Sequence, residues 1–490
     1  MKLKKSFFYI LLALFCLYLA CLSTNYDWDL FARLIVGENF IESGILPYKD
    51  FLSYTPTHNW YDHEWGSGVV FYLFLKYFGA FGLILLQAGL IFMTTVFVTL
   101  TTQLEKRHYP VFLFFAVLFA SLLNYLSPFL VRSHMFTFFF FSVFLYLLEK
   151  NRQYETKAIW IIPILTIIWN NLHGGVVSGL GIIFIYIVTA FIEREKIPTK
   201  LLCVLAVSTA ALIINPYGIK YLSFLLSATT MERKYIVEWW SALHPIHIKH
   251  YLAPVLVILT MFVAEFKKKD ITKILVSGVT VFLGLLHAKL LPLGLITVGA
   301  YCYNDIVKLI NSVILRKAEK SSYIITIVFA LMIPLFSPTY ARADFSLFPL
   351  YEVEFLKVNN IRGNLVLPFG QGSYASYKLY PNNLIFMDGR YEEVYNNKEF
   401  LALRDFELAE KNWTDIINNY PTDILMPPKK SEIYTVLVKD KDWVKIFEGR
   451  ECGIFVKKEN AHQEYIMPEK SIEYYRKTMF KHEEWDKEGV

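Results

Sequence analysis

The segment AFGLILLQAGLIFMTTVFVTLTT, residues 80–102, contains no charged residue and is long enough to cross the hydrocarbon core of a bilayer as one helix. Similar apolar segments recur between residues 6 and 340, separated by short polar connections. The chain is therefore predicted to be mainly α, with a polytopic transmembrane helix bundle. We predict about eleven spans, at residues 6–22, 80–102, 110–126, 134–149, 158–170, 175–192, 199–214, 250–265, 271–286, 290–308 and 322–340.

The composition separates a membrane region from a soluble one. Of the 490 residues, 55% are hydrophobic and 19% are charged, which is too apolar for a single soluble core of this length. We expect a transmembrane domain at residues 1–341, with a first outer loop at about 23–79, followed by a soluble α/β domain at residues 342–490. Residues 66–78 are apolar but short, and could lie along the membrane interface or pack as a half-helix.

The amino terminus has a basic start followed by an apolar run, which also fits a cleaved signal peptide. Tyr18 and Leu19 fit a lipoprotein signal poorly, and many spans follow, so we interpret residues 6–22 as a retained anchor. The five cysteines show no metal-ligand spacing, and only Cys452 lies in the soluble region, so no disulfide framework is implied.

Charge asymmetry predicts the orientation of the spans. With the amino terminus inside, every inner loop is basic, as the positive-inside rule requires. These inner clusters are Lys2 to Lys5, Lys106-Arg107, Lys150 to Lys157, Arg194 to Lys200, Lys267 to Lys273 and Arg316 to Lys320. The net charge of +6 is therefore explained by membrane orientation, and no nucleic-acid partner is expected. An odd number of spans places residues 342–490 on the outer face.

The unusual polar sequences gather on the predicted outer face. Two carboxylates, Asp27 and Asp29, stand where the first span leaves the hydrocarbon, and ionisable groups at that depth suggest a functional site. Partial burial beside a like charge would raise the pKa of one carboxyl, which suits a general base. The alternative is that both residues hydrate a helix end or cap the next helix, predicted from about residue 29 to Ser43-Gly44 as an amphipathic interfacial helix.

Several of these sequences resemble a known superfamily. The first-loop sequences are Asp27-Trp28-Asp29, Gly37-Glu38-Asn39, Gly44-Ile45-Leu46-Pro47, Asp50-Phe51-Leu52-Ser53-Tyr54-Thr55 and Trp60-Tyr61-Asp62-His63-Glu64-Trp65. They resemble the first outer loop of bacterial GT-C-fold glycosyltransferases, which include lipopolysaccharide galacturonosyltransferase-like and protein O-mannosyltransferase-like membrane proteins. Three later sequences resemble a bacterial branch of that superfamily: Trp169 to Gly175, Asn215-Pro216-Tyr217-Gly218 and Met387-Asp388-Gly389-Arg390-Tyr391.

The resemblance implies a reaction and its partners. In the superfamily, an acidic residue at the start of the first outer loop acts as base on the acceptor, and the donor is a sugar joined to a polyprenyl phosphate. Asp27 and Asp29 are accordingly the candidate catalytic residues of an inverting transfer to an extracytoplasmic glycan, lipid or protein acceptor. The resemblance also implies a bacterial inner membrane location, and the loop charges and span count predict a cytoplasmic amino terminus and an extracytoplasmic carboxy-terminal domain.

The departing phosphate requires positive charge or strong hydrogen-bond donors. Five residues near predicted outer span ends could supply them: Arg132, His134, His173, His287 and Lys289. Arg132 could grip a phosphate through two bonds, whereas Lys289 would act as a point charge. The alternatives are that Arg132 and Lys289 reach toward lipid headgroups, and that His173 is hydrogen-bonded within helix packing.

Other polar residues are candidates for acceptor binding or loop structure. Asp62, His63 and Glu64 could be metal ligands, but adjacent residues point in different directions. We therefore expect no cofactor and assign no metal site, although a divalent cation remains possible. The remaining candidates are Asn171, Glu238, Asp388 and Arg390. Asp388 and Arg390 could instead form a turn with a structural ion pair.

The soluble region is predicted to be a small α/β domain. Strands are expected at residues 363–369, 384–388, 423–426 and 452–457, and helices around 349–359 and 398–419. The sequence Gly370-Gln371-Gly372 could cradle a phosphate, but a plain turn is the simpler interpretation. Two other function classes stay open: a noncatalytic scaffold of envelope polysaccharide assembly, and a lipid-carrier transporter or flippase, for which we find no internal repeat.

Overall fold

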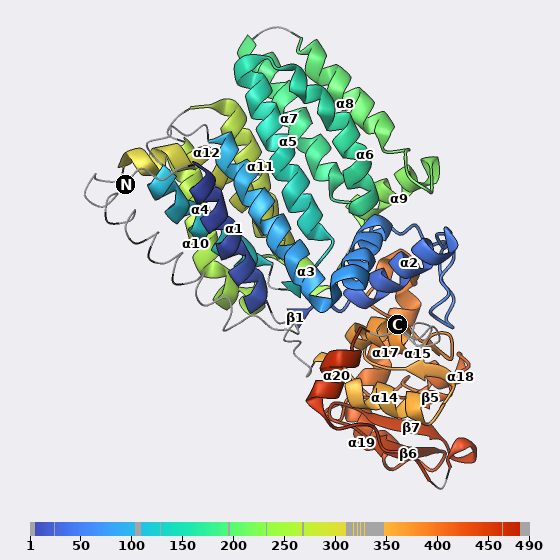
Figure 1. Cartoon of the computed structure of the whole chain (residues 1–490). Coiled ribbons are helices and arrows are strands. Elements are labelled where there is room, and N and C mark those ends of the chain that lie inside the picture. The colour runs from blue at the N-terminus through green and yellow to red at the C-terminus, as the bar shows by residue number, and fades with distance from the viewer. Residues whose placement is uncertain are drawn as a thin grey trace. The chain divides into compact units, whose positions relative to one another are not determined.

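The chain forms two compact units in a computed structural model (Figure 1). The helical unit is Met1–Ser23 with Phe81–Thr339, and the mixed unit is Thr24–Ala80 with Tyr340–Val490. The structure describes residues 5–23, 25–102, 109–127, 129–194, 197–231, 233–266, 269–309, 347–462 and 464–480, with positions 317, 321, 324 and 328.

The helical unit is built from long apolar helices. They are α1 (Lys5–Leu22), α4 (Tyr109–Leu126), α5 (His134–Tyr154), α6 (Ile162–Leu172), α7 (Val176–Arg194), α8 (Thr199–Ala211), α9 (Ile219–Thr230), α10 (Pro245–Phe266), α11 (Ile271–Leu286) and α12 (Leu291–Leu309). Short elements connect them: β2 (Phe129–Leu130), η2 (Lys157–Ile161), η3 (Val237–Trp239) and η4 (Ala288–Leu290). Helix α3 (Trp65–Thr101) bends at Gly79, whose φ of 60° suits a residue without a Cβ.

Each predicted span before residue 310 coincides with a described helix. A lipid-exposed segment must satisfy its backbone hydrogen bonds internally, and a helix does so within a single apolar run. The predicted span 322–340 lies almost entirely outside the described residues. Three described helices are long and apolar enough to cross a membrane: Trp65–Thr101, Val176–Glu193 and Pro245–Phe266. The other apolar helices are shorter, so the number of about eleven spans stays a prediction.

Charged clusters mark both ends of the helical unit. At the carboxy-terminal end of α5, the guanidinium of Arg152 donates two bonds of 2.9 Å to Asp270, the residue that caps α11. Glu149 and Glu193 lie 3.6 Å from the same guanidinium. The opposite end of α5 begins at His134, beside Arg132. The two ends of α5 and α11 therefore carry separate polar clusters, joined by apolar helix.

The mixed unit contains a five-stranded sheet in the order β4-β3-β5-β7-β6. Strand β3 (Gly363–Val366) runs parallel to β4 (Asn383–Ile385) and β5 (Ile424–Leu425), whereas β7 (Gly453–Lys457) is antiparallel to β5 and to β6 (Trp443–Glu448). The predicted strand regions hold β3, β4, β5 and β7, but β6 was not predicted. The helices are α14 (Leu350–Val358), α15 (Gly372–Leu379), α16 (Tyr391–Val394), α17 (Asn397–Glu407), α18 (Asp415–Asn418), α19 (Glu432–Leu437) and α20 (Ile472–Thr478).

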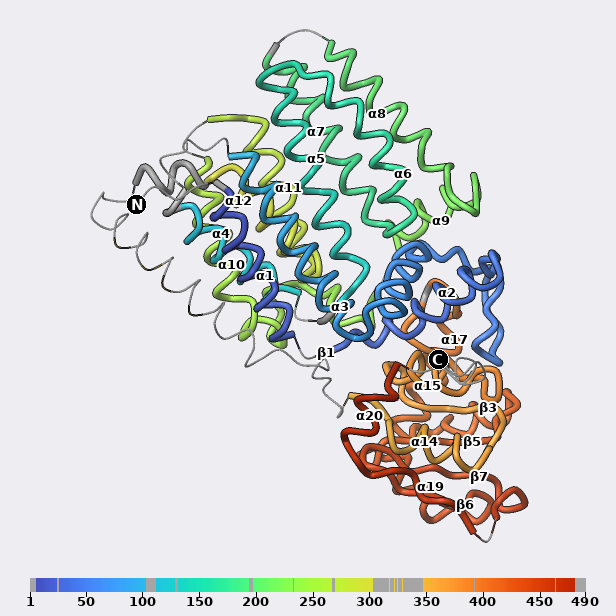
Figure 2. The backbone as a smooth tube through the Cα atoms, viewed as in Figure 1, coloured from blue at the N-terminus to red at the C-terminus, as the bar shows by residue number. Residues whose placement is uncertain are grey.

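The first outer loop folds together with the carboxy-terminal sheet as one unit (Figure 2). The loop contains β1 (Asn25–Tyr26) and α2 (Leu30–Ser43), and α2 ends at Gly44 with φ 70°, as predicted. Helix α2 packs on α15 through Phe31, whose ring lies 5.0 Å from that of Tyr374. Ser53 also pairs with Ile385 in a parallel bridge. Loop and sheet thus share a core.

Helix α2 differs from the prediction of an amphipathic interfacial helix. Residues Leu30 to Glu38 are all buried, including Arg33 at 3% exposure. A helix with no solvated face in this stretch needs cover on every side, and α15 supplies part of that cover. The prediction failed because it treated Arg33 as a solvated residue, whereas carboxylates within the mixed unit neutralise it.

Candidate functional site

The first candidate residues, Asp27 and Asp29, lie at the entrance to α2. The Asp27 side chain is 9% exposed, and its Oδ1 accepts a bond of 3.5 Å from the Asp29 amide. Asp29 occupies the N-cap position of α2, and its carbonyl accepts the first helical bond from Arg33 at 3.1 Å. Among the described residues, the Asp29 side chain makes no capping hydrogen bond, so capping does not explain its carboxylate.

Backbone from the carboxy-terminal region holds this motif closely. A Cβ on Gly389 would lie 2.0 Å from Oδ1 of Asp29, and a Cβ on Gly370 would lie 2.2 Å from the ring of Trp28. Both distances are shorter than Cβ contacts in real structures, so a side chain at either position would displace Asp29 or Trp28. The two glycines therefore let the chain approach Trp28 and Asp29, which explains Gly370 by packing. Sequence reasoning missed this role for Gly389, since only the fold brings residues 29 and 389 together.

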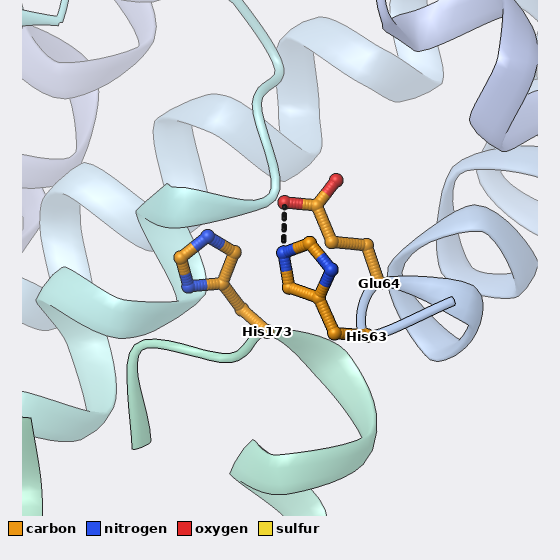
Figure 3. A group of neighbouring side chains, drawn as sticks. All are labelled: His63, Glu64 and His173. Atoms are coloured by element: carbon orange, nitrogen blue, oxygen red, sulfur yellow. Dashed lines mark ion pairs between the residues drawn. The ribbon is translucent and has the colours of Figure 1, made fainter. Parts of the chain in front are cut away.

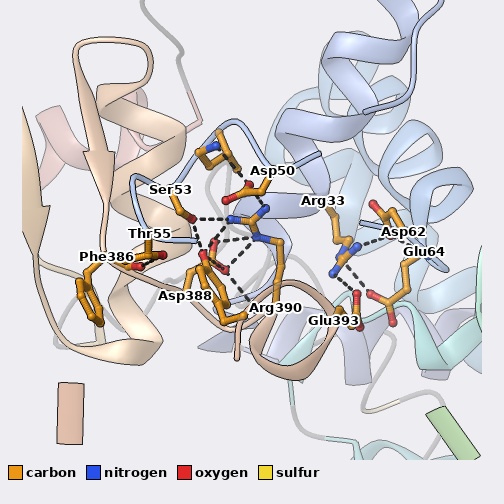
Figure 4. A network of polar contacts seen from close by, with 12 residues as sticks. Arg33, Asp50, Ser53, Thr55, Asp62, Glu64, Phe386, Asp388, Arg390 and Glu393 are labelled. Carbon is orange, nitrogen blue, oxygen red and sulfur yellow. Dashed lines mark hydrogen bonds and ion pairs between the residues drawn. The ribbon is translucent and has the colours of Figure 1, made fainter. Parts of the chain in front are cut away.

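A buried arginine, Arg33, forms ion pairs with three carboxylates of the mixed unit (Figure 4). Arg33 forms ion pairs with Asp62, with Glu64 at 3.0 Å and with Glu393 at 3.7 Å. Burial opposes its charge, but Asp62, Glu64, Glu393 and Asp29 together raise the pKa of Arg33 above its ordinary value. Arg33 is thus a fixed cation, close enough to Asp29 for the two charges to attract. Neither Arg33 nor Glu393 was a predicted site residue.

His63 links two of these carboxylates. Its Nε2 lies 3.6 Å from Oε1 of Glu64 (Figure 3), and its Nδ1 lies 3.2 Å from Oε1 of Glu393. Burial opposes protonation, but Glu393 and Glu64 raise the pKa of His63 to about 9. Burial likewise opposes ionisation of Glu393, yet His63 and Arg33 hold the pKa of that carboxyl below its ordinary value. His63 is therefore a cation at neutral pH.

The same residues include a candidate metal site. Asp62, His63 and Glu393 each offer a ligand atom, and these atoms lie within 4.8 Å of one another. Metal binding requires a neutral histidine, and a cation here would compete with Arg33 and with the proton on His63. Burial also raises the pKa of Asp62 above its ordinary value despite the nearby Arg33. The arrangement favours an internal ion-pair network, and no step is assigned to a metal.

A second arginine network lies deeper in the mixed unit (Figure 4). Arg390 binds Asp388 at 2.8 Å and Asp50 at 2.5 Å, and all three side chains are fully buried. Its guanidinium carbon also lies 4.6 Å from the centre of the Trp60 ring. Burial opposes the charge, but Asp388 and Asp50 raise the pKa of Arg390 well above its ordinary value. Asp388 and Arg390 thus expose no surface to an acceptor, and they tie Asp50 of the first loop to the sheet.

In the helical unit, two predicted phosphate-binding residues converge on one carboxylate. Arg132 donates from Nη1 to Oε2 of Glu238 at 2.7 Å and from Nη2 to Oε1 at 3.3 Å. Lys289 donates to the same Oε1 at 2.7 Å. Burial opposes ionisation, but Arg132 and Lys289 hold the pKa of Glu238 well below its ordinary value. We call Arg132, Glu238 and Lys289 the cationic cluster, because two cations share one anion.

Aromatic and histidine side chains border the cationic cluster. The Nζ atom of Lys289 lies 5.4 Å from the centre of the Trp239 ring, and the guanidinium carbon of Arg233 lies 4.4 Å from that centre. Nδ1 of His287 lies 2.6 Å from the Trp239 carbonyl oxygen. His134, bonded to Ser127 at 2.8 Å, interacts electrostatically with Arg132, Lys289 and His173.

His173 and Asn171 have structural partners. Nδ1 of His173 lies 2.7 Å from the hydroxyl of Thr137, and Asn171 donates to the carbonyls of Ile167 and Ile214 at 2.8 Å and 2.9 Å. The alternative of hydrogen bonding within helix packing therefore describes the contacts of both residues.

The architecture was compared with solved structures. The oligosaccharyltransferase of Archaeoglobus fulgidus in its apo form matches with a TM-score of 0.54, at 11% identity over 87% of this chain and 70% of that chain. The same archaeal protein, AglB, in complex with an inhibitory peptide and a dolichol-phosphate matches with a TM-score of 0.56, at 11% identity over 99% and 78%. This chain has the GT-C fold.

A third AglB structure, tethered to an acceptor peptide containing the NVT sequon via a disulfide bond, matches with a TM-score of 0.56 at 10% identity, over 99% of this chain and 78% of that one. No protein-family model and no curated protein matches the chain. The predicted GT-C fold is thus confirmed, and the particular bacterial branch stays a prediction.

Proposed function

We propose that the chain is a membrane glycosyltransferase that moves a sugar from a polyprenyl-phosphate donor to an extracytoplasmic glycan, lipid or protein acceptor. The GT-C fold, which the chain shares with an oligosaccharyltransferase solved in complex with a dolichol-phosphate, supports this proposal. The single observation that carries the donor assignment is the cationic cluster, in which Arg132 and Lys289 present hydrogen-bond donors to one anion. We place the enzyme in a bacterial inner membrane, with a cytoplasmic amino terminus and the mixed unit outside.

The proposed chemistry is an inverting displacement. The carboxylate of Asp29 or Asp27 takes the proton of the acceptor hydroxyl, and the oxygen forms a bond to the anomeric carbon. The bond between that carbon and the phosphate oxygen breaks, and the phosphate leaves with the electron pair. General-base help of this kind contributes on the order of 10²–10⁴ in rate. Fixed cations near a departing phosphate lower the barrier further, since they stabilise charge as it develops.

The two candidate carboxylates differ in their surroundings. Asp29 is partly exposed, does not cap its helix within the described residues, and is held by the backbone of Gly389 and the charge of Arg33. Asp27 is more buried and accepts a bond from the Asp29 amide. A partly exposed carboxylate in a rigid backbone setting fits a base that must meet a hydroxyl. We therefore propose Asp29 as the general base, and we propose that Asp27 supports the backbone of Asp29 through the bond from its amide.

The test uses cells that lack the gene, complemented with full-length variants. Asp29→Asn, Asp27→Asn and the pair are compared with Asp442→Asn, an exposed carboxylate before β6. We expect Asp29→Asn to lower transfer by at least about a hundredfold, as for loss of a general base. Asp27→Asn should lower it less, and Asp442→Asn should match the wild type. The measurement is the amount of lipid-linked sugar that accumulates and of surface glycan that is lost, at equal protein level.

The outcome also separates the rival function classes. Normal glycosylation in cells that carry Asp27→Asn together with Asp29→Asn would eliminate the catalytic assignment. A scaffold would tolerate both changes as long as it still folds and assembles. A flippase would change the sidedness of the lipid-linked sugar without changing the total sugar transferred in a detergent extract. Loss of transfer in the extract, with normal protein level, supports the glycosyltransferase.

A further inference from the structure

The cationic cluster has an uneven charge. Arg132 and Lys289 contribute two positive charges, and Glu238 contributes one negative charge because its pKa is held low by both cations. Glu238 contacts each of them at 2.7 Å, so its carboxylate lies beside any ligand that these cations bind. The three residues come from different parts of the helical unit: the connection before α5, η3 and η4. These three residues together carry one net positive charge.

Lipid phosphates differ in the charge that they bring to such a site. A sugar joined to a polyprenyl phosphate is a phosphodiester with one negative charge. The leaving group is a phosphomonoester, which carries about −1.5 to −2 charges at pH 7 because its second pKa is about 6. A carboxylate beside the phosphate repels the dianion about twice as strongly as the monoanion. The charge of Glu238 therefore shifts the preference of the site toward the diester.

We propose that Glu238 is a specificity-determining residue that shifts the preference of the phosphate site toward the phosphodiester donor and away from the phosphomonoester product. The proposal rests on the proposed function, since it takes a lipid phosphate as the ligand of Arg132 and Lys289. Glu238 lies beside the product dianion and repels it, so the product leaves and the donor returns. A neutral residue at position 238 would retain the product.

The argument holds whatever the charge of the neighbouring groups. The groups facing Glu238 and its two cations are Arg233 before η3, His287 before η4, Tyr251 on α10, and His134 with His173 at the ends of α5 and α6. These groups are the same in every variant, and all variants are compared with the same two probes at one pH. The substitution Glu238→Gln adds one positive charge to the site, so the change between variants isolates Glu238.

The experiment measures binding to the purified full-length chain in detergent micelles. The probes are farnesyl phosphate, a monoester, and farnesyl methyl phosphate, a diester that does not titrate in this range. At pH 7.5 we expect Glu238→Gln to shift the ratio of the two dissociation constants toward the monoester by on the order of tenfold, the size of one charge at a partly exposed site. Glu238→Asp retains the charge and should stay near the wild-type ratio.

The pH dependence gives a second readout that a purely structural role would not change. Lowering the pH from 7.5 to 5 removes charge from the monoester. Relative to the diester, its binding should weaken less in the wild type than in Glu238→Gln, because the wild-type site attracts the lost charge less strongly. The matched control is Glu432→Gln, which removes an exposed carboxylate on α19 and should leave the ratio unchanged.

Each outcome has one meaning. An unchanged ratio in Glu238→Gln, with both probes still bound, would overturn the selectivity proposal and leave the proposed function standing. Failure of both probes to bind the folded wild type would remove the phosphate site, and with it the selectivity proposal. A shifted ratio in a protein that transfers no sugar would support the selectivity of the site while contradicting the glycosyltransferase.

Discussion

The charge of His63 predicts how the stability of the protein depends on pH. Glu393 and Glu64 raise its pKa from the ordinary 6.5 to about 9, so the folded state binds the proton more tightly than the unfolded state. This contribution is complete below pH 6.5 and is lost as the pH rises through 9. The difference between 6.5 and about 9, at about 1.36 kcal/mol for each pH unit, gives at most about 3 kcal/mol.

The measurement is thermal unfolding of the detergent-solubilised chain between pH 7.5 and 9.5, where about 2 kcal/mol of this effect should disappear. The pH window begins above the pKa of Glu407, which burial raises to about 7. His63→Asn should be less stable at pH 7.5 and should lose most of the decline toward pH 9.5. His462→Asn, an exposed histidine in the same unit, should behave as the wild type. An equal decline in His63→Asn and the wild type would refute the raised pKa.

Two further predictions concern the mixed unit. Gly389→Ala should lower the turnover number at least about tenfold with a small change in melting temperature. The new Cβ would lie 2.0 Å from Oδ1 of Asp29 and would displace that carboxylate. The control is Gly89→Ala, whose Cβ would meet nothing within 4 Å and which should keep full turnover. Arg390→Met should destabilise the fold by about 3–5 kcal/mol in denaturant unfolding, since it leaves buried carboxylates, among them Asp50, without a counter-charge. Wild-type stability of Arg390→Met would contradict the buried network.

The helical unit was predictable because its signal is local. An apolar run of about 20 residues must satisfy its backbone internally, so helix positions such as 271–286 follow from composition alone. The convergence of Arg132 and Lys289 was anticipated through topology, since both residues flank predicted spans on one side. Their shared partner, Glu238, was assigned only to acceptor binding or loop structure, because no local pattern reveals which charges meet.

The mixed unit was less predictable because its contacts join distant parts of the chain. Gly44 ends α2 as predicted, but the burial of α2 depends on α15, more than 300 positions later. Arg33 has the sequence context of a solvated residue on an amphipathic helix, and only Glu393 and the first-loop carboxylates show otherwise. Strand β6 was missed because its exposed residues interrupt the apolar alternation.

The discontinuous mixed unit has a consequence for biogenesis. Residues 24–80 leave the ribosome first, yet their partners begin at residue 340, which is 260 positions after residue 80. At about 5–20 residues per second, this interval lasts roughly 13–52 s. During translation, Arg33 and Phe31 are therefore synthesised well before their partners Glu393 and Tyr374. A prematurely terminated chain would thus lose the first loop's native structure as well as the missing domain.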